Sequence, residues 1–298
     1  MKEAELNRPE PSLIYVHLEL LVVVAIWAGT FVATKLLLME VPPALSALYR
    51  YLLASVVIVA VDWRNGEKIQ RQDYPAIIFL ALTGVTLYYL LQHFGIRYTD
   101  ATDAAILISL SPVFIGLISW ILLGEKLRPL TVTGLALAFV GAVLVITGGR
   151  FDYAAMDQQV WGDILILLTA VSWAFYSVYG KKLLGRYQVN TIIKYTTVIG
   201  TIFILPFSLS EIADVKSFAL SWVGVGCLLY LGPLASVYGY LAWYRALSRL
   251  APVTVGSYLY FRPLLTGIIA ALVLGEAIGA GVAVGGGLIL LGTYLTVK

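Results

Sequence analysis

The sequence has few charged residues, few histidines and one cysteine, and each shortage excludes a class of protein. Asp, Glu, Lys and Arg make up 12% of the 298 residues, whereas they make up about 25% of a typical soluble domain. Cys227 is the single cysteine, so no disulfide can form within the chain, and His17 and His93 are the only histidines. No H-E-x-x-H and no G-x-x-x-x-G-K-[ST] motif occurs. We therefore expect no enzyme activity, no metal and no cofactor.

Hydrophobic residues, in contrast, make up 60% of the chain and fall into long runs. A run of about 17–25 apolar residues can cross the hydrocarbon core of a bilayer as a helix, and lipid does not tolerate irregular backbone. The ten predicted spans are 18–38, 44–61, 75–96, 102–123, 130–148, 162–180, 190–208, 221–243, 252–274 and 280–297. The sequence thus predicts an all-α polytopic membrane protein that partners with the lipid bilayer and not with nucleic acid.

The basic residues are distributed unequally between the two faces of this predicted bundle. Residues 1–17 lack the pattern of a signal peptide, so we expect them to form a cytoplasmic segment before the first helix. In that orientation most loop Lys and Arg residues are cytoplasmic, and the opposite face has only Lys35, Arg97, Arg150 and Lys216. Positive charge is enriched in cytoplasmic loops. We therefore expect a multi-pass protein of the cell membrane with both termini in the cytoplasm.

The chain contains two copies of one unit. Residues 103–125 align with 254–276 without a gap, and the first helix of each half ends in Trp-x₇-Lys. The matched pairs are Trp27 and Trp173, Lys35 and Lys181, Pro112 and Pro263, Gly124 and Gly275, and Glu125 and Glu276. We place the halves at 18–150 and 151–298, with five predicted helices each. Because five is odd, the halves must be inverted in the membrane, as in many secondary transporters.

The doubled motifs W-x₇-K and (S/R)-P-x₁₁-G-E resemble the EamA family of the drug/metabolite transporter superfamily over nearly the whole chain. The resemblance implies a carrier that works by alternating access and often exports amino acids or other small metabolites. It also implies a central cavity among helices one, three, four, six, eight and nine. Small multidrug relatives couple transport to protons through a glutamate eight residues before the motif lysine. Trp27 and Trp173 stand at that position here.

Arg262 lies near the middle of the span 252–274, where a charged side chain is costly and must face protein or water. No acidic residue is expected at that depth, and a guanidinium binds a carboxylate with two hydrogen bonds. We therefore expect Arg262 to bind a carboxylate of the substrate. The alternative is a structural contact with backbone carbonyls that Pro263 leaves without a hydrogen-bond donor.

Helical spacing groups further aromatic and polar residues on faces that could line the same cavity. The predicted substrate-binding residues are Arg262, Tyr258, Tyr88, Gln92, Trp173, Tyr176, Ser111 and Trp27. Pro112 and Pro263 are predicted to kink their helices and to serve as gating or hinge positions. Arg50 and Lys194 lie nearer the membrane surfaces, where we expect them to extend toward water or to play a structural part.

Glycine-rich faces on the spans 130–148 and 280–297 predict close helix packing, either between the two halves or between the protomers of a homodimer. These faces contain Gly134, Ala138, Gly141, Gly281, Gly285 and Gly292. Glu125 and Glu276 each follow a glycine that ends a helix, and we expect them to cap or to bridge helices at the membrane surface.

The sequence thus predicts a secondary transporter, an exporter or exchanger of amino acids or related carboxylate-bearing solutes. An antiporter of phosphorylated or nucleotide-linked sugars is the alternative among carriers. Relatives of that kind in the superfamily hold phosphate with several basic residues. Here Arg262 has no basic neighbour on its helix before Arg249. A channel or a receptor is the alternative from another class, and the internal inversion argues against it.

Overall fold

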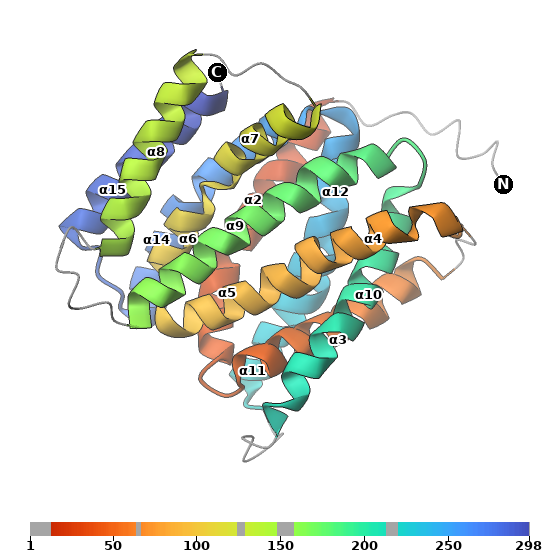
Figure 1. Cartoon of the computed structure of the whole chain (residues 1–298). Coiled ribbons are helices and arrows are strands. Elements are labelled where there is room, and N and C mark those ends of the chain that lie inside the picture. Colours follow the sequence, from red (N-terminus) through yellow and green to blue (C-terminus); the bar gives the residue numbers. More distant parts are fainter. Residues whose placement is uncertain (1–12, 64–66, 124–128, 148–157, 213–219, 298) are drawn as a thin grey trace.

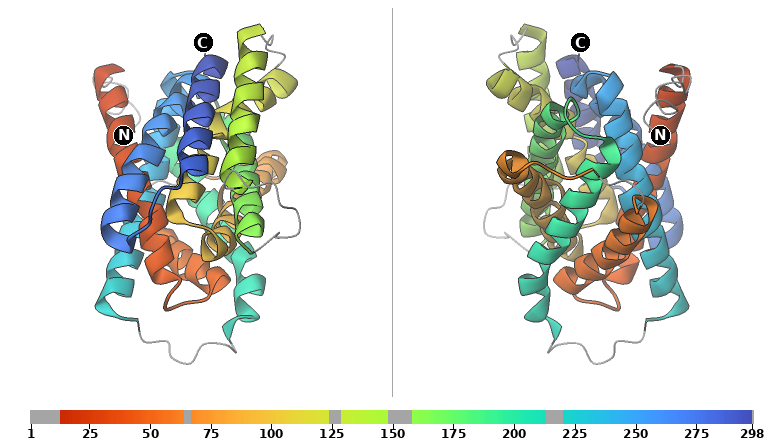
Figure 2. Two further views of the ribbon diagram at one scale, coloured as in Figure 1. Left: turned by 90° about the vertical axis from the view of Figure 1, so that its left-hand side faces the viewer. Right: turned by 90° about the vertical axis from the view of Figure 1, so that its right-hand side faces the viewer.

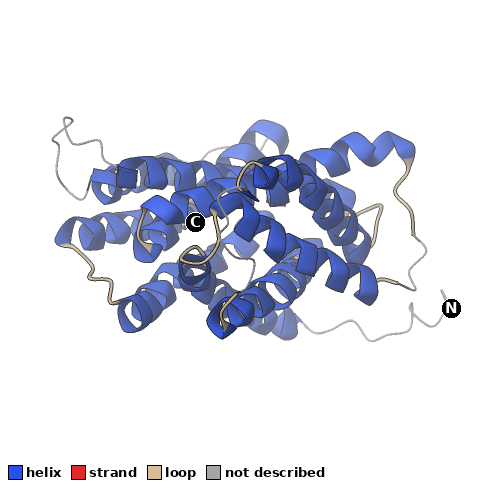
Figure 3. Cartoon of the chain, turned by 90° about the horizontal axis from the view of Figure 1, so that it is seen from below, coloured by secondary structure: helices blue, strands red, loops and turns tan. Residues whose placement is uncertain are grey.

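The computed structural model describes residues 13–63, 67–123, 129–147, 158–212 and 220–297. Within these ranges all regular secondary structure is helical, as the sequence predicts (Figure 3). The helices form one bundle in which the first and second halves of the chain intermingle (Figure 1).

The helices follow the predicted spans to within a few residues. In the first half they are α2 (Leu13–Leu37), α3 (Pro43–Val61), η1 (Arg71–Asp73), α4 (Tyr74–Ala81), η2 (Leu82–Thr86), α5 (Leu87–Tyr98), α6 (Ala101–Ile108), α7 (Ser111–Leu123) and α8 (Pro129–Thr147). In the second half they are α9 (Gln158–Leu183), α10 (Val189–Leu209), α11 (Trp222–Leu229), η5 (Tyr230–Tyr238), α12 (Gly239–Arg249), α13 (Pro252–Ser257), η6 (Tyr258–Tyr260), α14 (Phe261–Leu274) and α15 (Ala280–Val297).

Several of these helices join end to end into longer segments. Among the described residues, eight single helices or joined segments are long and apolar enough to cross a membrane, and they correspond to eight of the predicted spans. The apolar parts of α8 and α15 are shorter. The described part of the chain is therefore all-helical and typical of a multi-pass membrane protein, and the crossing of the membrane by α8 and α15 stays a prediction.

The last helices of the two halves, α8 and α15, lie side by side at one edge of the bundle (Figures 1 and 2). A Cβ atom on Gly141 would lie 2.6 Å from the carbonyl oxygen of Gly285, and one on Gly292 would lie 2.5 Å from that of Gly134. Only glycine permits two backbones to approach so closely. The glycine-rich faces thus pack against each other within one chain, so a homodimer would have to use other surfaces of these helices.

Two of the long segments are interrupted close to their prolines. Residues Ser109 and Leu110 separate α6 from α7 just before Pro112, and the 3₁₀ turn η6 separates α13 from α14 just before Pro263. Each proline lies in the first turn of the helix that follows, where its missing N–H has no partner to lose. The helices are thus interrupted next to both prolines, while a kink at each and a role as hinges stay predictions.

Two further segments contain π-helical turns, which the sequence did not indicate. These are η2, between α4 and α5, and η5, between α11 and α12, and they occupy equivalent places in the two halves. A π turn holds one extra residue and rotates the helix face that follows it, and it is often found at functional sites. Here the rotated faces carry the tyrosines Tyr88, Tyr89 and Tyr240 toward the centre of the bundle.

Candidate functional site

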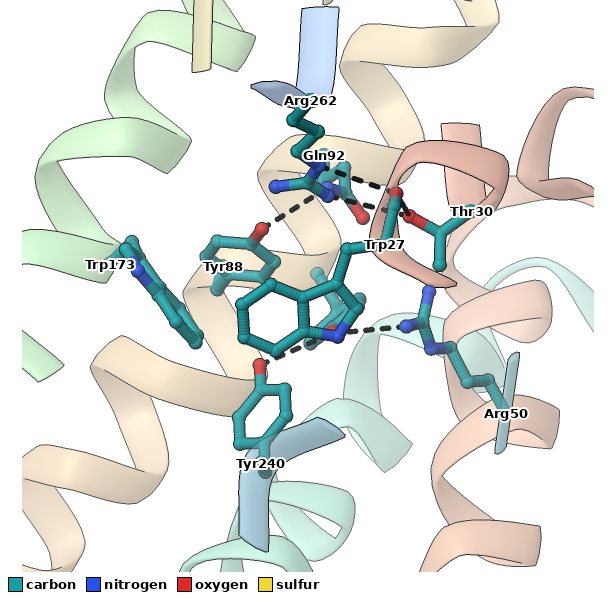
Figure 4. A pocket seen from close by; sticks show the side chains of 9 residues that line it. Trp27, Thr30, Arg50, Tyr88, Gln92, Trp173, Tyr240 and Arg262 are labelled. Carbon is teal, nitrogen blue, oxygen red and sulfur yellow. Dashed lines mark hydrogen bonds between the residues drawn. The ribbon is translucent and has the colours of Figure 1, made fainter. Parts of the chain in front are cut away.

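A cavity lies at the centre of the bundle, between residues of both halves (Figure 4). Its lining combines two cations, neutral polar groups and aromatic rings, and it contains no acidic residue. The lining residues are Trp27, Thr30, Arg50, Tyr88, Tyr89, Gln92, Trp173, Tyr240 and Arg262. Its free volume is about 10 Å³, which is room for about one water molecule. A larger solute can therefore enter only if the surrounding side chains move.

The tryptophans of the two W-x₇-K motifs meet at this cavity. The ring centroids of Trp27 and Trp173 lie 5.4 Å apart with the planes at 89°, an edge-to-face arrangement that aromatic rings favour. The indole N–H of Trp27 donates to the carbonyl of Ala235 at 3.0 Å. Trp173 also packs against Tyr88 and Tyr240, with centroid distances of 5.3 and 5.4 Å. The contact between equivalent residues thus joins the two halves.

Tyr89 and Tyr240 form a second contact between equivalent positions, since they are 151 residues apart like the two prolines. Their hydroxyl groups lie 3.1 Å apart, and the Tyr240 hydroxyl also donates to the carbonyl of Gly84 at 2.9 Å. Gly84 lies in the π turn η2. The centre of the bundle, where these equivalent positions meet, is therefore a cluster of aromatic rings with a few polar groups among them.

Arg262 extends from α14 into the cavity, and only 4% of its surface is exposed. Its Nε donates to the carbonyl of Trp27 at 3.3 Å and its Nη2 to the hydroxyl of Thr30 at 3.4 Å. The guanidinium also stacks 4.4 Å from the ring centre of Phe31. Both acceptors are neutral and belong to α2, not to the turn that Pro263 interrupts. None of the ion pairs among the described residues includes Arg262.

Arg50 lines the same cavity from α3, so the expectation that it extends toward the membrane surface is wrong. It lies only two turns into its helix, but that face of α3 packs against α5 and η5 and leaves the side chain 1% exposed. Its Nε donates to Ser236 at 2.9 Å and its Nη2 to Tyr89 at 3.1 Å. Lys194 also does not extend freely, because it forms an ion pair of 2.5 Å with Asp62.

The cavity contains five of the predicted binding residues and omits three. Trp27, Tyr88, Gln92, Trp173 and Arg262 line it. The three outside it are Tyr176, which lies behind Trp173 at 5.5 Å between ring centroids, Ser111, whose hydroxyl donates to the carbonyl of Ile108 at 2.6 Å, and Tyr258, whose hydroxyl lies 2.5 Å from Nδ1 of His17.

Sequence reasoning missed four lining residues: Thr30, Arg50, Tyr89 and Tyr240. The offset of 151 between the two tyrosines was a usable signal, because residues on the pseudosymmetry axis of a repeat protein meet their own equivalents. No comparable signal marked Thr30 or Arg50. The burial of Arg50 depends on the phase of α3 about its axis, which one isolated charge does not reveal.

At one end of the bundle, Lys35 connects the ends of α2, α6 and α14. Its Nζ donates to Asp100 at 2.8 Å, to Glu276 at 2.9 Å and to the carbonyl of Thr99 at 3.2 Å. The Glu276 carboxylate also accepts from the backbone N–H groups of Ala101 and Thr102, at 2.9 and 3.0 Å. Glu276 thus caps α6 and bridges helices, as expected for it, while Glu125 lies outside the described residues.

The opposite end of the bundle repeats part of this arrangement. Lys181, the equivalent of Lys35, donates to the carbonyl of Leu250 at 2.7 Å. Leu250 is the equivalent of Thr99 at the offset of 151. The motif lysine of each half therefore binds a carbonyl at the end of the segment that carries the pocket tyrosines.

We expect Glu276→Gln to destabilise the protein by about 1–2 kcal/mol, because it removes the ion pair with Lys35 and weakens two charged hydrogen bonds. Burial raises the pKa of Glu276, but the Ala101 and Thr102 amides and Lys35 outweigh it, so the pKa lies below its ordinary value. The stabilisation is therefore complete above that value and is lost as the pH falls through the depressed pKa. Thermal unfolding of wild type and variant, measured in detergent from pH 7 to pH 3, should converge at the acid end.

The matched control is Asp100→Asn, which removes the other carboxylate on Lys35. The Asp100 side chain is 52% exposed, against 9% for Glu276, and exposed ion pairs contribute little. We expect a smaller loss. An equal loss of stability in the two variants would contradict the conclusion that Glu276 is the more important carboxylate partner of Lys35.

Comparisons with known proteins agree with this fold. The profile of the EamA-like transporter family matches residues 15–147 and again residues 160–298. An uncharacterized transporter of Archaeoglobus fulgidus is 38% identical over 283 residues, which cover 94% of this chain and 96% of that protein. A probable terminal-alkyne amino-acid exporter of Streptantibioticus cattleyicolor is 31% identical and covers 93% of this chain and 91% of that protein. A crystal structure shares the fold with a TM-score of 0.68 at 21% identity, covering 95% of this chain and 96% of its own.

The family profile matches both halves of the chain. The alignment with the Archaeoglobus transporter covers nearly the whole length of both proteins. The central cavity between the halves is consistent with that assignment. The chain therefore belongs to the EamA-like transporter family, as the sequence motifs indicated, and it is a membrane transporter and not an enzyme.

Proposed function

We propose that this protein is a secondary transporter of amino acids or related carboxylate-bearing solutes, which it exports or exchanges by alternating access. One observation carries the proposal: Arg262 is buried in the central cavity with only neutral acceptors at long distances. A guanidinium stays charged at any physiological pH, and a charge inside a membrane protein is costly unless it is compensated. A substrate carboxylate would compensate it. The name of the Streptantibioticus relative, an amino-acid exporter, supports the same substrate class.

The aromatic lining fits the rest of such a solute. Tyr88, Trp173 and Tyr240 offer apolar ring faces, while Gln92 offers amide groups that can donate and accept hydrogen bonds. Binding sites for small solutes commonly combine apolar walls with a few polar groups that fix orientation. We propose Arg262 and these residues, with Trp27, as the substrate-binding set.

We further propose that the ten helical segments form two inverted halves, 18–150 and 151–298, after a cytoplasmic segment 1–17. The two matches of the family profile, one in each half, support this division. The contacts between Trp27 and Trp173 and between Tyr89 and Tyr240 lie where an axis between such halves would pass. The hinge positions in this scheme are Pro112 and Pro263, which follow the interruptions of their segments.

The orientation can be tested by cysteine labelling. In a Cys227→Ala background, we expect single cysteines at positions 68 and 184 to react only with a reagent added to the cytoplasmic face. A cysteine at Met39, whose side chain is 71% exposed between α2 and α3, should react only from outside. Labelling of position 39 by a reagent that reaches only the cytoplasmic face, as it does in inside-out vesicles, would reverse the assignment of both termini.

The substrate class can be tested with purified protein in liposomes. We expect amino acids or small carboxylic acids to compete for exchange and to raise the unfolding temperature, and the corresponding amides or amines to do neither. The comparison isolates the carboxylate, since each pair shares one carbon skeleton. If no acid is bound better than its amide, the proposed recognition by Arg262 is wrong.

A further inference from the structure

The cavity contains a second cation for which the proposed function so far gives no role. Arg50 and Arg262 enter it from α3 and α14, and Figure 4 shows both arginine side chains among the residues that line the cavity. The other lining residues are aromatic, hydroxyl or amide side chains, so the lining carries two positive charges and no negative one. Two like charges in a small cavity of low dielectric constant repel each other strongly.

The hydrogen bonds of Arg50 leave its charge uncompensated. Its acceptors are the hydroxyl groups of Ser236 and Tyr89, and the Ser236 hydroxyl donates in turn to the carbonyl of Leu231 at 2.9 Å. The Nη1 atom is buried and has no hydrogen-bond partner among the described residues. A guanidinium has five N–H donors, so a buried Nη1 without an acceptor is an unfavourable arrangement.

The contact of Arg50 with an aromatic ring reduces this cost only in part. The guanidinium carbon lies 4.2 Å from the ring centre of Tyr89. Such a cation–π contact is weaker than pairing with an anion in a cavity from which water is excluded. Arg262 is in the same situation, above Phe31. One carboxylate in the cavity would compensate one of these arginines and leave the other without a counter-charge.

We infer that Arg50 forms a second anion subsite of the same cavity, and that the substrates are small solutes with two acidic groups, one for each guanidinium. This inference rests on the proposed function and narrows it from carboxylate-bearing solutes to dianions. Dicarboxylates, acidic amino acids and phosphorylated acids share that chemistry. A neutral amino acid does not fit equally well, because its single carboxylate would leave one of the two arginines without a counter-charge.

The test uses three probes with one carbon skeleton and a decreasing number of charges: succinate, its monoamide and its diamide. Dissociation constants are measured by calorimetry and by ligand-induced shifts of the unfolding temperature, on purified full-length protein. We expect succinate to bind about tenfold to a hundredfold more tightly than the monoamide, the difference that one charged hydrogen-bonded pair produces. A parallel measurement with 2-phosphoglycolate distinguishes a preference for phosphate from one for a second carboxylate.

The variants locate the second subsite. In Arg50→Gln the preference for succinate over the monoamide should fall to about one, whereas the monoamide, still held by Arg262, should bind nearly as in wild type. Arg50→Lys keeps the charge and should retain part of the preference, which also covers the case that Arg50→Gln does not fold. Arg97→Gln is the matched control, because it removes a cation from an exposed position of α5 and should leave the preference unchanged.

The outcomes separate this inference from the proposed function. If the monoamide binds as tightly as succinate and 2-phosphoglycolate, and all bind more tightly than the diamide, the second subsite is refuted while recognition of one carboxylate stands. If Arg50→Gln retains the wild-type preference, Arg50 is a structural tie between α3, α5 and η5 and the inference is refuted. If none of the acids binds better than the diamide, the proposed function is refuted and the dianion subsite with it.

Discussion

Replacing Arg262 by glutamine should weaken the binding of a carboxylate substrate about tenfold to a hundredfold, and exchange in liposomes should fall accordingly. The guanidinium is the cation that enters the cavity from α14, and its present acceptors, the Trp27 carbonyl and the Thr30 hydroxyl, are weak ones at 3.3 and 3.4 Å. A carboxylate can take two short, charged hydrogen bonds from the same fork. Glutamine offers neither the charge nor the fork.

Arg262→Lys should recover only part of the activity, since lysine keeps the charge but has no planar fork. Amide analogues of the substrate should bind to wild type and Arg262→Gln with equal affinity, because they never engage the charge. The protein must elute as a single species in size-exclusion chromatography for the comparison to count. Normal transport by a well-folded Arg262→Gln would show that Arg262 is a structural tie to α2 and that the cavity recognises its substrate by other groups.

Much of the fold could be predicted because it depends on features that a sequence displays directly. Run length and apolarity placed the helices to within a few residues. The repeat added more: the Trp-x₇-Lys motifs identified Trp27 and Trp173, and these two residues do meet at the centre. The same offset would have identified Tyr89 and Tyr240, which also meet. Pseudosymmetry thus predicts contacts near its axis with no knowledge of the distances.

One failure arises where a helix departs from regular geometry. Tyr258 stands four residues before Arg262, and in a continuous α-helix the two side chains would share one face. The 3₁₀ turn η6 lies between them and changes the rotation per residue, so Tyr258 contacts His17 instead of the cavity. Hydrophobic periodicity is too coarse to locate such turns.

Arg50 shows a different limit of sequence reasoning. Its place in the span 44–61 indicates how high along the helix it lies, but not the direction in which its side chain points. Its partner Ser236 lies in the π-helical η5, 186 residues away. Only the tertiary packing of α3 against that segment brings the second arginine into the cavity.

The second large effect is expected from Gly292→Val, which should destabilise the protein by about 3 kcal/mol and reduce the yield of monodisperse protein. A Cβ atom at Gly292 would lie 2.5 Å from both the Ala138 nitrogen and the Gly134 carbonyl oxygen. These neighbours are backbone atoms of α8, which no change of side-chain rotamer can move. The helices α8 and α15 must therefore separate along their contact. The loss of stability should thus lie at the upper end of the range that is usual for overpacking.

Gly287→Val is the matched control on the same helix. A Cβ atom at Gly287 would meet no atom within 4 Å. We therefore expect the free energy of unfolding of this variant to lie within about 0.5 kcal/mol of the wild-type value. The pair also distinguishes packing within one chain from packing between two. If the glycines hold the halves of one chain together, Gly292→Val lowers the unfolding temperature of the protomer and leaves the oligomeric state, measured by light scattering, unchanged. A change in the oligomeric state with an unchanged unfolding temperature of the protomer would contradict this packing, because Gly292 would then have to face a second molecule.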